Sequence, residues 1–321
     1  MSYIRKVAIL GASGSLGQVV VPALLESGFI VTIISRPGGR GVAVSSKAVE
    51  TKEVAYDDLS GLTGALRDQE ALVEIFNPAA SVYQRTIIQA ALAAGIEHLI
   101  TNEFGLDTFN PNITKLPSAQ VKVQAQQVLE EELQIAIAKG NSSPLAWTGI
   151  FSGVWYDWAI REGKFWVNPT TRTITRFGSG NQKTSISRTA LNGEAVVAIL
   201  REPERFRNRP AYFASHTITT NELIALIGET SQGTEKPWTI TDVPDMEAFS
   251  RDAMNLWNTD TEKGVEDRLH TQAFTMLSIG ALFNENNLFG ADYGERLEAG
   301  WDEGTEKLRD QLKHLIEEAG D

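Results

Sequence analysis

An apolar run followed by three regularly spaced glycines limits what the first residues of this chain can fold into. Residues 7–10, Val-Ala-Ile-Leu, have the character of a buried strand, and Gly11, Gly14 and Gly17 follow at intervals of three residues. Apolar residues then recur at helical spacing up to Gly28, a residue type typical of a helix end. A glycine turn between strand and helix lets a pyrophosphate rest on the helix N-terminus. The pattern therefore predicts a dinucleotide-binding unit, with an ordinary strand–helix turn as the alternative.

The glycines of this turn have separate expected roles. Gly11 makes the turn, Gly14 lets the backbone approach a phosphate, and Gly17 lets the helix pack on the strand. The spacing differs from the G-x-G-x-x-G fingerprint, so the strand and helix on either side carry the argument. We expect the dinucleotide to be held by Gly11, Ser13, Gly14, Ser15, Leu16 and Gly17.

The end of the second expected strand, residues 29–34, indicates which dinucleotide is bound. An acidic residue at this distance from the glycines would hold the ribose 2′-hydroxyl of NAD, but the chain has Ser35 and Arg36 there. A guanidinium suits a 2′-phosphate, and Arg40 offers a second cation. We therefore expect NADPH. The alternatives are a solvated Arg36, or one that stacks on adenine in an NAD enzyme.

Strands and helices continue to alternate over the first part of the chain. Further expected elements are strands at residues 53–56, 71–76 and 98–101, a short helix ending at Leu66, and a helix that runs from a capping box at Ser81–Gln84 to Ala94. This order predicts an α/β fold of Rossmann type with a doubly wound parallel sheet. Ligands bind at the carboxyl ends of such strands, which adds Asn77, Pro78 and Asn102 to the expected cofactor-binding residues.

Aromatic residues become dense after about residue 146. We expect an apolar substrate cleft there, with core packing as the alternative, and its wall to be formed by Phe151, Trp155, Tyr156, Trp158 and Trp166. The change in pattern predicts two domains, a Rossmann domain at residues 1–153 and a smaller α+β substrate-binding domain at residues 154–321.

The later segments contain one expected hairpin and three expected helices. Residues 173–177 and 183–187 flank Gly178–Asn181 and are predicted to pair as a hairpin. Helices are predicted at residues 190–200, 219–227 and 306–318. We expect the last of them to be a charged amphipathic helix with a solvated face.

Composition excludes several classes of function. The formal net charge of −12 argues against nonspecific nucleic-acid binding, which needs basic patches. The chain has no cysteine, which rules out disulfides and thiolate catalysis, and its four histidines lack the spacing of metal ligands, so we expect no metal site. No apolar run approaches about 18 residues and no signal peptide is evident, so we expect no membrane partner and a cytoplasmic location.

The residue pair that most short-chain reductases use for proton transfer is missing. No tyrosine has a lysine four residues after it, so the Tyr-x-x-x-Lys pair is absent. The chain instead has Lys122 at the start of an expected helix, residues 121–133, soon after Asn102-Glu103-Phe104-Gly105. A lysine near its reference pKa of about 10.4 exchanges protons poorly at neutral pH, so a catalytic role requires burial or a neighbouring cation to lower that pKa.

Taken together, these segments resemble the NmrA-like and isoflavone reductase-like branch of the atypical short-chain dehydrogenases. The matching stretches are Gly11–Gly17, Ser35-Arg36, Asn102–Gly105 where the family has Ser-Glu-Phe-Gly, Lys122 with Leu129-Glu130, Gly149–Gly153, Gly178-x-Gly180 and Thr220–Leu223. Ser187-Arg188-Thr189 departs from the acid that members often carry near the domain junction. The resemblance spans roughly residues 5 to 230, and Glu-Phe-Gly followed by the helix lysine is its most specific part.

The resemblance implies an NADPH-dependent oxidoreductase of secondary metabolism that transfers hydride to an aromatic or conjugated small molecule. Lys122 is then the catalytic residue that transfers the accompanying proton, and it also touches the cofactor. The alternative is an NmrA-like sensor or regulator that binds NAD(P) without turnover. A homodimer is left open, and the resemblance does not extend to the identity of the substrate.

Overall fold

The computed structural model describes residues 4–39, 48–142, 144–230 and 237–319. Contacts divide the chain into two compact units, each assembled from separate stretches of sequence. The first unit comprises Met1–Phe104, Ala119–Ile150 and Asn192–Ala211, and the second comprises Gly105–Ser118, Phe151–Leu191 and Tyr212–Asp321. One passage from the first unit to the second falls after Ile150, close to the boundary predicted between residues 153 and 154, which remains a prediction.

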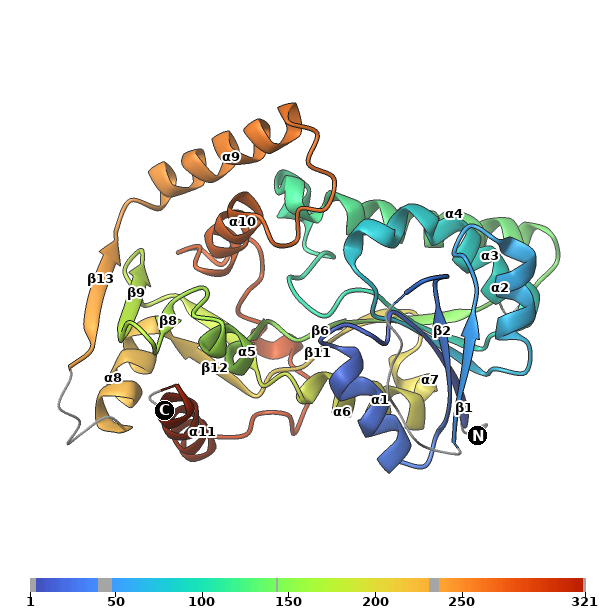
Figure 1. Cartoon of the computed structure of the whole chain (residues 1–321), viewed down its shortest axis with the longest axis horizontal. Helices are drawn as coiled ribbons and strands as arrows, with labels where there is room; N and C mark the ends of the chain where they lie inside the picture. Colours follow the sequence, from blue (N-terminus) through green and yellow to red (C-terminus); the bar gives the residue numbers. More distant parts are fainter. Residues whose placement is uncertain (1–3, 40–47, 143, 231–236, 320–321) are drawn as a thin grey trace. The chain divides into compact units, whose positions relative to one another are not determined.

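A seven-stranded sheet forms the frame of the first unit (Figure 1). Its strands are β1 (Lys6–Leu10), β2 (Ile30–Ser35), β3 (Val49–Glu53), β4 (Ala71–Glu74), β5 (His98–Thr101), β6 (Ala146–Phe151) and β11 (Arg209–Tyr212). They lie in the order β11-β6-β5-β4-β1-β2-β3, and the pairs from β3 across to β6 are all parallel. The predicted doubly wound parallel sheet of Rossmann type is confirmed.

Helices cover both faces of this sheet, which explains why β4 and β5 are buried along their whole length. The helices are α1 (Gly17–Glu26), α2 (Leu59–Leu66), α3 (Gln84–Ala94), α4 (Gln120–Ala138), α6 (Leu191–Arg201) and α7 (Pro203–Phe206). Figure 1 shows α2, α3 and α4 along one face and α1 with α6 on the other. The approach of α6 to α1 is close, because a Cβ on Gly193 would lie 2.5 Å from the carbonyl oxygen of Val19.

The third strand lies earlier in the chain than predicted. The prediction of residues 53–56 was wrong, because β3 occupies Val49–Glu53 and pairs with β2 at the edge of the sheet. An edge strand is held by main-chain hydrogen bonds on one side and needs few apolar side chains. The polar sequence Val-Glu-Thr-Lys-Glu therefore gave no hydrophobic signal.

The predicted capping box at Ser81–Gln84 was also wrong, although the helix ends as predicted. A 3₁₀ helix, η1 (Pro78–Tyr83), precedes α3, and Tyr83 provides no side-chain cap among the described residues. The Gln84 side chain instead donates hydrogen bonds to the carboxyl group of Glu74. Gly95 closes α3 in the left-handed conformation, with a φ of 78°.

The second unit contains two small sheets and several helices. Its strands are β7 (Val154–Trp155), β8 (Val167–Asn168), β9 (Thr173–Phe177), β10 (Lys183–Ser187), β12 (His216–Thr219) and β13 (Thr239–Val243). Its helices are α5 (Tyr156–Arg161), α8 (Thr220–Thr230), α9 (Met246–Glu262), α10 (Gln272–Leu282), α11 (Thr305–Glu318) and the 3₁₀ helices η2 (Pro111–Lys115), η3 (Pro117–Ala119) and η4 (Gly294–Arg296). One apolar core, built around Tyr156, Trp166 and Phe283, joins the two sheets and the helices α5, α8, α9, α10 and α11.

The predicted hairpin between β9 and β10 does not form, so that prediction was wrong. β9 pairs with β8 and β13, whereas β10 pairs with β7 and β12 in a different sheet. Residues far along the chain hold the turn that connects the two strands. The Ser179 hydroxyl donates to Glu285 at 3.0 Å, and the Asn221 N–H donates to the Gly180 carbonyl at 3.0 Å. The two strand ranges themselves were predicted correctly.

The C-terminal helix α11 buries one face and exposes the other, as expected of a charged amphipathic helix. Leu308, Leu312 and Leu315 are each at most 3% exposed and belong to the core of the second unit. Their spacing of four and three residues places them on one side of the helix. The charged residues in between occupy the opposite face, which is mostly exposed.

His98 is buried at the start of β5 and acts as a hydrogen-bond donor. The Thr148 hydroxyl donates its proton to the Phe206 carbonyl at 2.7 Å, so it can only accept at the His98 Nε2 atom 2.8 Å away. The imidazole therefore carries a proton on Nε2. Burial lowers its pKa to about 4, with a smaller contribution from Arg207.

Substituting glutamine for His98 should change how stability depends on pH. Between pH about 6.5 and 4 the unfolded chain binds the imidazole proton and the folded chain does not, so acidification removes stability that His98 contributes near pH 7. The difference in unfolding free energy between wild type and His98→Gln should shrink by roughly 3 kcal/mol over this range. Urea denaturation from pH 7 to 4 measures it, with exposed His314→Gln as the control, and a constant difference would contradict the argument.

Candidate cofactor and catalytic site

Two close backbone approaches shape the glycine turn after β1. Gly11 has a φ of 95°, and a Cβ on it would lie 2.5 Å from the backbone of Phe76. A Cβ on Gly17 would lie 1.8 Å from the carbonyl oxygen of Ala12. Packing within the protein is therefore sufficient to require glycine at both positions.

The middle of the same turn faces solvent. Ser13, Gly14 and Ser15 are exposed, and the nearest described atom to a Cβ on Gly14 would be the Gly11 carbonyl oxygen at 3.7 Å. The first turn of α1 follows, and within the described chain Leu16 supplies no side-chain cap to it. Its Gln18 and Val19 N–H groups donate within the turn, to the carbonyls of Gly14 at 3.3 Å and Leu16 at 3.1 Å. Small exposed residues in front of an uncapped helix N-terminus fit a pyrophosphate.

Arg36 follows β2 and lies over an aromatic ring at the end of the sheet. Its guanidinium carbon is 5.8 Å from the ring centroid of Tyr56, and that ring is 5.9 Å from the ring of Phe76. Burial raises the pKa of Tyr56 to about 12, against the opposing charge of Arg36, so the phenol stays neutral. Ser35 is half-buried at the strand end, and Arg40 lies outside the described residues.

Two asparagines secure the carboxyl ends of β4 and β5. Asn77 Oδ1 accepts a hydrogen bond from the Ala79 N–H at 2.9 Å and caps η1, in which Pro78 is the first residue. Asn102 Nδ2 donates to the Phe76 carbonyl at 2.8 Å. The backbone at Phe76 thus contacts both the Gly11 turn and Asn102. The structure brings these predicted residues together at one edge of the sheet, where the asparagine side chains hold backbone.

Lys122 lies in the first turn of α4 and is half-buried. Its Nζ atom donates a hydrogen bond to the backbone carbonyl of Glu103, the residue that follows Asn102. Burial lowers the pKa of Lys122, and the charge of Glu103 opposes the shift. A lowered pKa is what proton exchange near neutral pH requires. Contact of Lys122 with a cofactor or substrate stays a prediction.

A buried carboxyl group lies at the same edge and was missed in the sequence. Glu74 is 1% exposed, and Gln84 Nε2 donates to its two carboxyl oxygens at 2.9 and 3.1 Å. Both residues line a cavity of about 10 Å³ together with Glu103, Lys122 and Gln126. Such a volume is roughly what one water molecule needs. The available signal was a single acid inside the apolar run Ala-Leu-Val-Glu-Ile-Phe.

The five aromatic residues predicted to contact substrate belong to the second unit, and they differ in accessibility. Phe151, Tyr156 and Trp166 are at most 3% exposed. Trp155 and Trp158 are half-buried and meet edge to face, with ring centroids 6.4 Å apart. Only this pair presents appreciable surface among the five. A substrate-binding role for the set stays a prediction.

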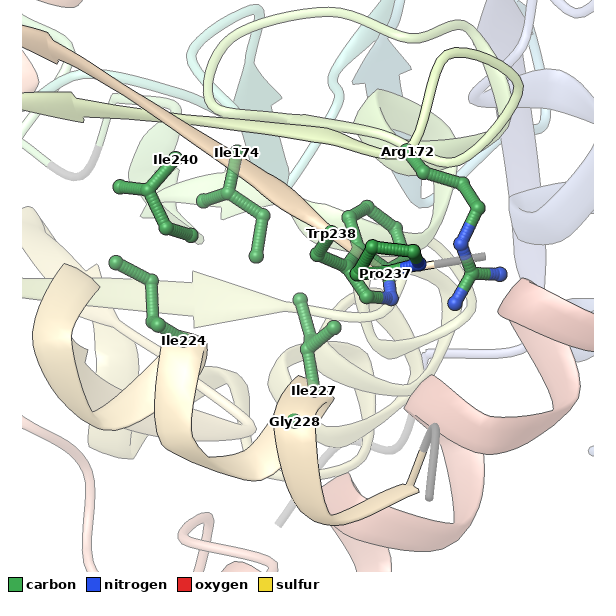
Figure 2. A pocket seen from close by; sticks show the side chains of 8 residues that line it. All are labelled: Arg172, Ile174, Ile224, Ile227, Gly228, Pro237, Trp238 and Ile240. Carbon is green, nitrogen blue, oxygen red and sulfur yellow. The ribbon is translucent and has the colours of Figure 1, made fainter. Parts of the chain in front are cut away.

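A separate apolar pocket of about 430 Å³ lies within the second unit, between α8, β9 and β13. Figure 2 shows Ile174, Ile224, Ile227 and Ile240 around it. Trp238 covers one end, where the guanidinium carbon of Arg172 is 5.0 Å from an indole centroid. The residues lining the pocket include none of the five predicted aromatic residues.

In the part of the chain that the structure describes, histidine and carboxylate side chains form no group of three or more arranged to hold a metal ion. No described helix combines the length and the hydropathy needed to cross a bilayer.

Known proteins similar to this chain are mostly named for redox chemistry. Oxidoreductase aprR of Aspergillus flavus is 30% identical over 231 residues, which are 72% of this chain and 75% of that protein. Phenylcoumaran benzylic ether reductase TP7 of Nicotiana tabacum is 27% identical over 242 residues, which are 70% of this chain and 74% of that protein.

Solved structures and a family model cover more of the chain. The binary complex of leucoanthocyanidin reductase with NADPH from Vitis vinifera superimposes with a TM-score of 0.68 over 98% of this chain and 99% of that one. At 17% sequence identity this likeness concerns the fold. The model of the NmrA-like family matches residues 4–313, nearly the full length. The chain therefore belongs to the NmrA-like family.

Proposed function

We propose that this protein is an NADPH-dependent oxidoreductase that reduces an aromatic or conjugated small molecule. The observation that carries the proposal is the position of Lys122, whose ammonium group is bound to the Glu103 carbonyl at the sheet edge that also carries the glycine turn. The names of the relatives, an oxidoreductase and a benzylic ether reductase, support this class of reaction.

We expect different residues of the chain to bind different parts of the cofactor. The exposed Ser13-Gly14-Ser15 stretch and the N-terminus of α1 would hold the pyrophosphate, because the positive end of a helix dipole attracts an anion. Arg36 pairs with the 2′-phosphate while its guanidinium stays over the Tyr56 ring. NADPH, when bound, supplies the hydride for the reaction.

Lys122 supplies the proton that balances the hydride. Its ammonium group donates a proton to the atom that becomes negative, and the neutral amine then recovers a proton from solvent. Burial favours this exchange because it lowers the pKa of the Lys122 amine. The aromatic class of substrate is supported by the relative that is named a phenylcoumaran benzylic ether reductase.

A substrate screen tests the proposal directly. Titration with NADPH is followed by absorbance at 340 nm in the presence of enones, quinone methides, benzylic ethers and aromatic ketones. Oxidation of NADPH with any of them supports the reductase. Tight NADPH binding with no oxidation across the panel would replace it with the cofactor-sensing regulator.

Substituting alanine for Arg36 should separate the two nicotinamide cofactors. The variant loses the cation that faces the 2′-phosphate, so the Kd for NADPH should rise by about 10- to 100-fold while the Kd for NADH changes by less than about threefold. Fluorescence titration of both cofactors measures this, with Arg67→Ala, exposed after α2, as the control. Equal losses for the two cofactors would remove the 2′-phosphate role.

A further inference from the structure

Glu74 occupies a position where a carboxyl group is costly. It is the last residue of β4, between Val73 and Ile75, and all three are buried. Burying a charged carboxylate without partners is strongly unfavourable, so a buried acid calls for a compensating arrangement around it. The contacts of Glu74 are therefore informative about its role.

The carboxyl group of Glu74 holds two other segments of the first unit. It accepts hydrogen bonds from the side chain of Gln84 at 2.9 and 3.1 Å and from the backbone N–H of Asn102. The side-chain amide of Asn102 also donates a hydrogen bond to the Phe76 carbonyl. The residue after β5 is thus held through both its backbone and its side chain. Glu74 thereby fixes the backbone at the start of the Asn102-Glu103 turn.

The same turn receives Lys122. The Glu103 carbonyl accepts the hydrogen bond from Lys122 Nζ, and Glu103 Oε1 accepts one from Gln126 Nε2 at 2.8 Å. Glu74, Glu103 and Lys122 also line one cavity of about 10 Å³. Two carboxyl groups and one amine therefore line one small, partly buried cavity, and charges in such surroundings interact more strongly than in bulk water.

We propose that Glu74 is a positioning residue for Lys122: it holds the turn that binds the lysine, and its charge state sets how tightly Lys122 retains its proton. The proposal rests on the proposed function only in assigning that proton to a substrate. The link between the two groups is a property of the free protein.

The direction of the coupling follows from the surroundings of Glu74. Burial raises its pKa to about 8, the Gln84 and Asn102 hydrogen bonds oppose the rise, and the charge of Glu103 adds to it. Tyr56 and Glu103 interact electrostatically with it, and Lys122 lines the same cavity. Glu74 is thus mostly neutral at pH 7, and its ionisation above that pH adds a negative charge that favours the ammonium form of Lys122.

The experiment is a pH titration of Lys122 in the free protein. Protein labelled with ¹³Cε-lysine is followed by NMR, and the Lys122 signal is the one missing from Lys122→Met. In wild type the chemical shift of this signal should change in two steps. The first step lies near pH 8, where Glu74 ionises, and the second, at higher pH, is the titration of Lys122 itself. In Glu74→Gln the step near pH 8 should vanish. The pKa of Lys122 should fall by about one unit, because the negative charge that Glu74 acquires on ionisation is absent.

Two further variants make the test specific. Glu70→Gln is the matched control, because the Glu70 carboxylate also accepts backbone N–H groups, those of Arg5 and Lys6, but just before β4 begins. It should leave the Lys122 curve unchanged. Gln84→Leu removes an amide that lowers the pKa of Glu74, so the step should move above pH 8. This variant tests the proposal even if Glu74→Gln does not fold.

The outcomes separate this proposal from the proposed function. An identical Lys122 curve in wild type, Glu74→Gln and Gln84→Leu would overturn the role of Glu74, whatever the substrate screen finds. Failure of the screen with an intact step near pH 8 would defeat the reductase alone. Once a substrate is known, Glu74→Gln should remove the limb near pH 8 from the kcat profile while the KM for NADPH stays within about threefold.

Discussion

Replacing Lys122 with methionine is expected to lower kcat by roughly 10²- to 10⁴-fold, the contribution typical of a general acid. Methionine has a similar length and fills the half-buried site, but it carries no proton and cannot donate to the Glu103 carbonyl. Cofactor binding depends mainly on the glycine turn and Arg36, so the Kd for NADPH should change by less than about threefold. Steady-state kinetics and fluorescence titration measure the two quantities.

The control for this substitution lies on the same helix. Lys139→Met makes the same change at the exposed C-terminal end of α4 and should leave both kcat and Kd near wild type. Turnover that survives unchanged in Lys122→Met would exclude the lysine as the proton donor. A parallel loss of NADPH binding would instead assign it to cofactor binding alone.

Alanine at Gly11 should destabilise the protein by about 3 kcal/mol or more, or prevent folding. The new Cβ would lie 2.5 Å from the backbone of Phe76 at a φ of 95°, so a strained backbone and a clash with main chain coincide. Urea denaturation of the variant and of wild type measures the loss. A Gly11→Ala protein as stable as wild type would contradict the packing described for the turn.

Gly14 offers the complementary experiment. A Cβ there has no described neighbour closer than 3.7 Å, so Gly14→Ala should fold with a stability within about 0.5 kcal/mol of wild type. We nevertheless expect at least tenfold weaker NADPH binding, because the methyl group occupies the space beside the pyrophosphate. Gly64→Ala, at an open position in α2, is the matched control and should bind NADPH normally. Unchanged binding in Gly14→Ala would argue against a phosphate at this turn.

Much of the first unit could be predicted because its signals are local. The glycine turn follows an apolar strand, and Gly95 closes α3 in the left-handed conformation that glycine adopts freely. These features depend on neighbours in sequence. The helix that carries Lys122 and the parallel arrangement of the strands follow from the same pattern.

The errors share a physical cause, which is long-range pairing. The polar strand β3 forms because β2 offers it an edge, and Gln84 leaves its expected cap because a buried carboxyl group needs a donor. The strands β9 and β10 were located correctly, but their partners come from residues 216–243 and from short strands that carry little signal. The residues within a strand do not indicate which distant strands will pair with it.

The amino-acid order was sufficient for the fold class, the family resemblance and the position of Lys122 after the Asn102–Gly105 segment. Strand period, glycine conformation and helix spacing act over a few residues and can be read along the chain. Folding in three dimensions was needed to put Glu74 beside the turn that binds Lys122, and to bury Phe151, Tyr156 and Trp166 while leaving Trp155 and Trp158 accessible. Burial and electrostatic coupling depend on which distant residues meet, and these two quantities set the pKa of the lysine.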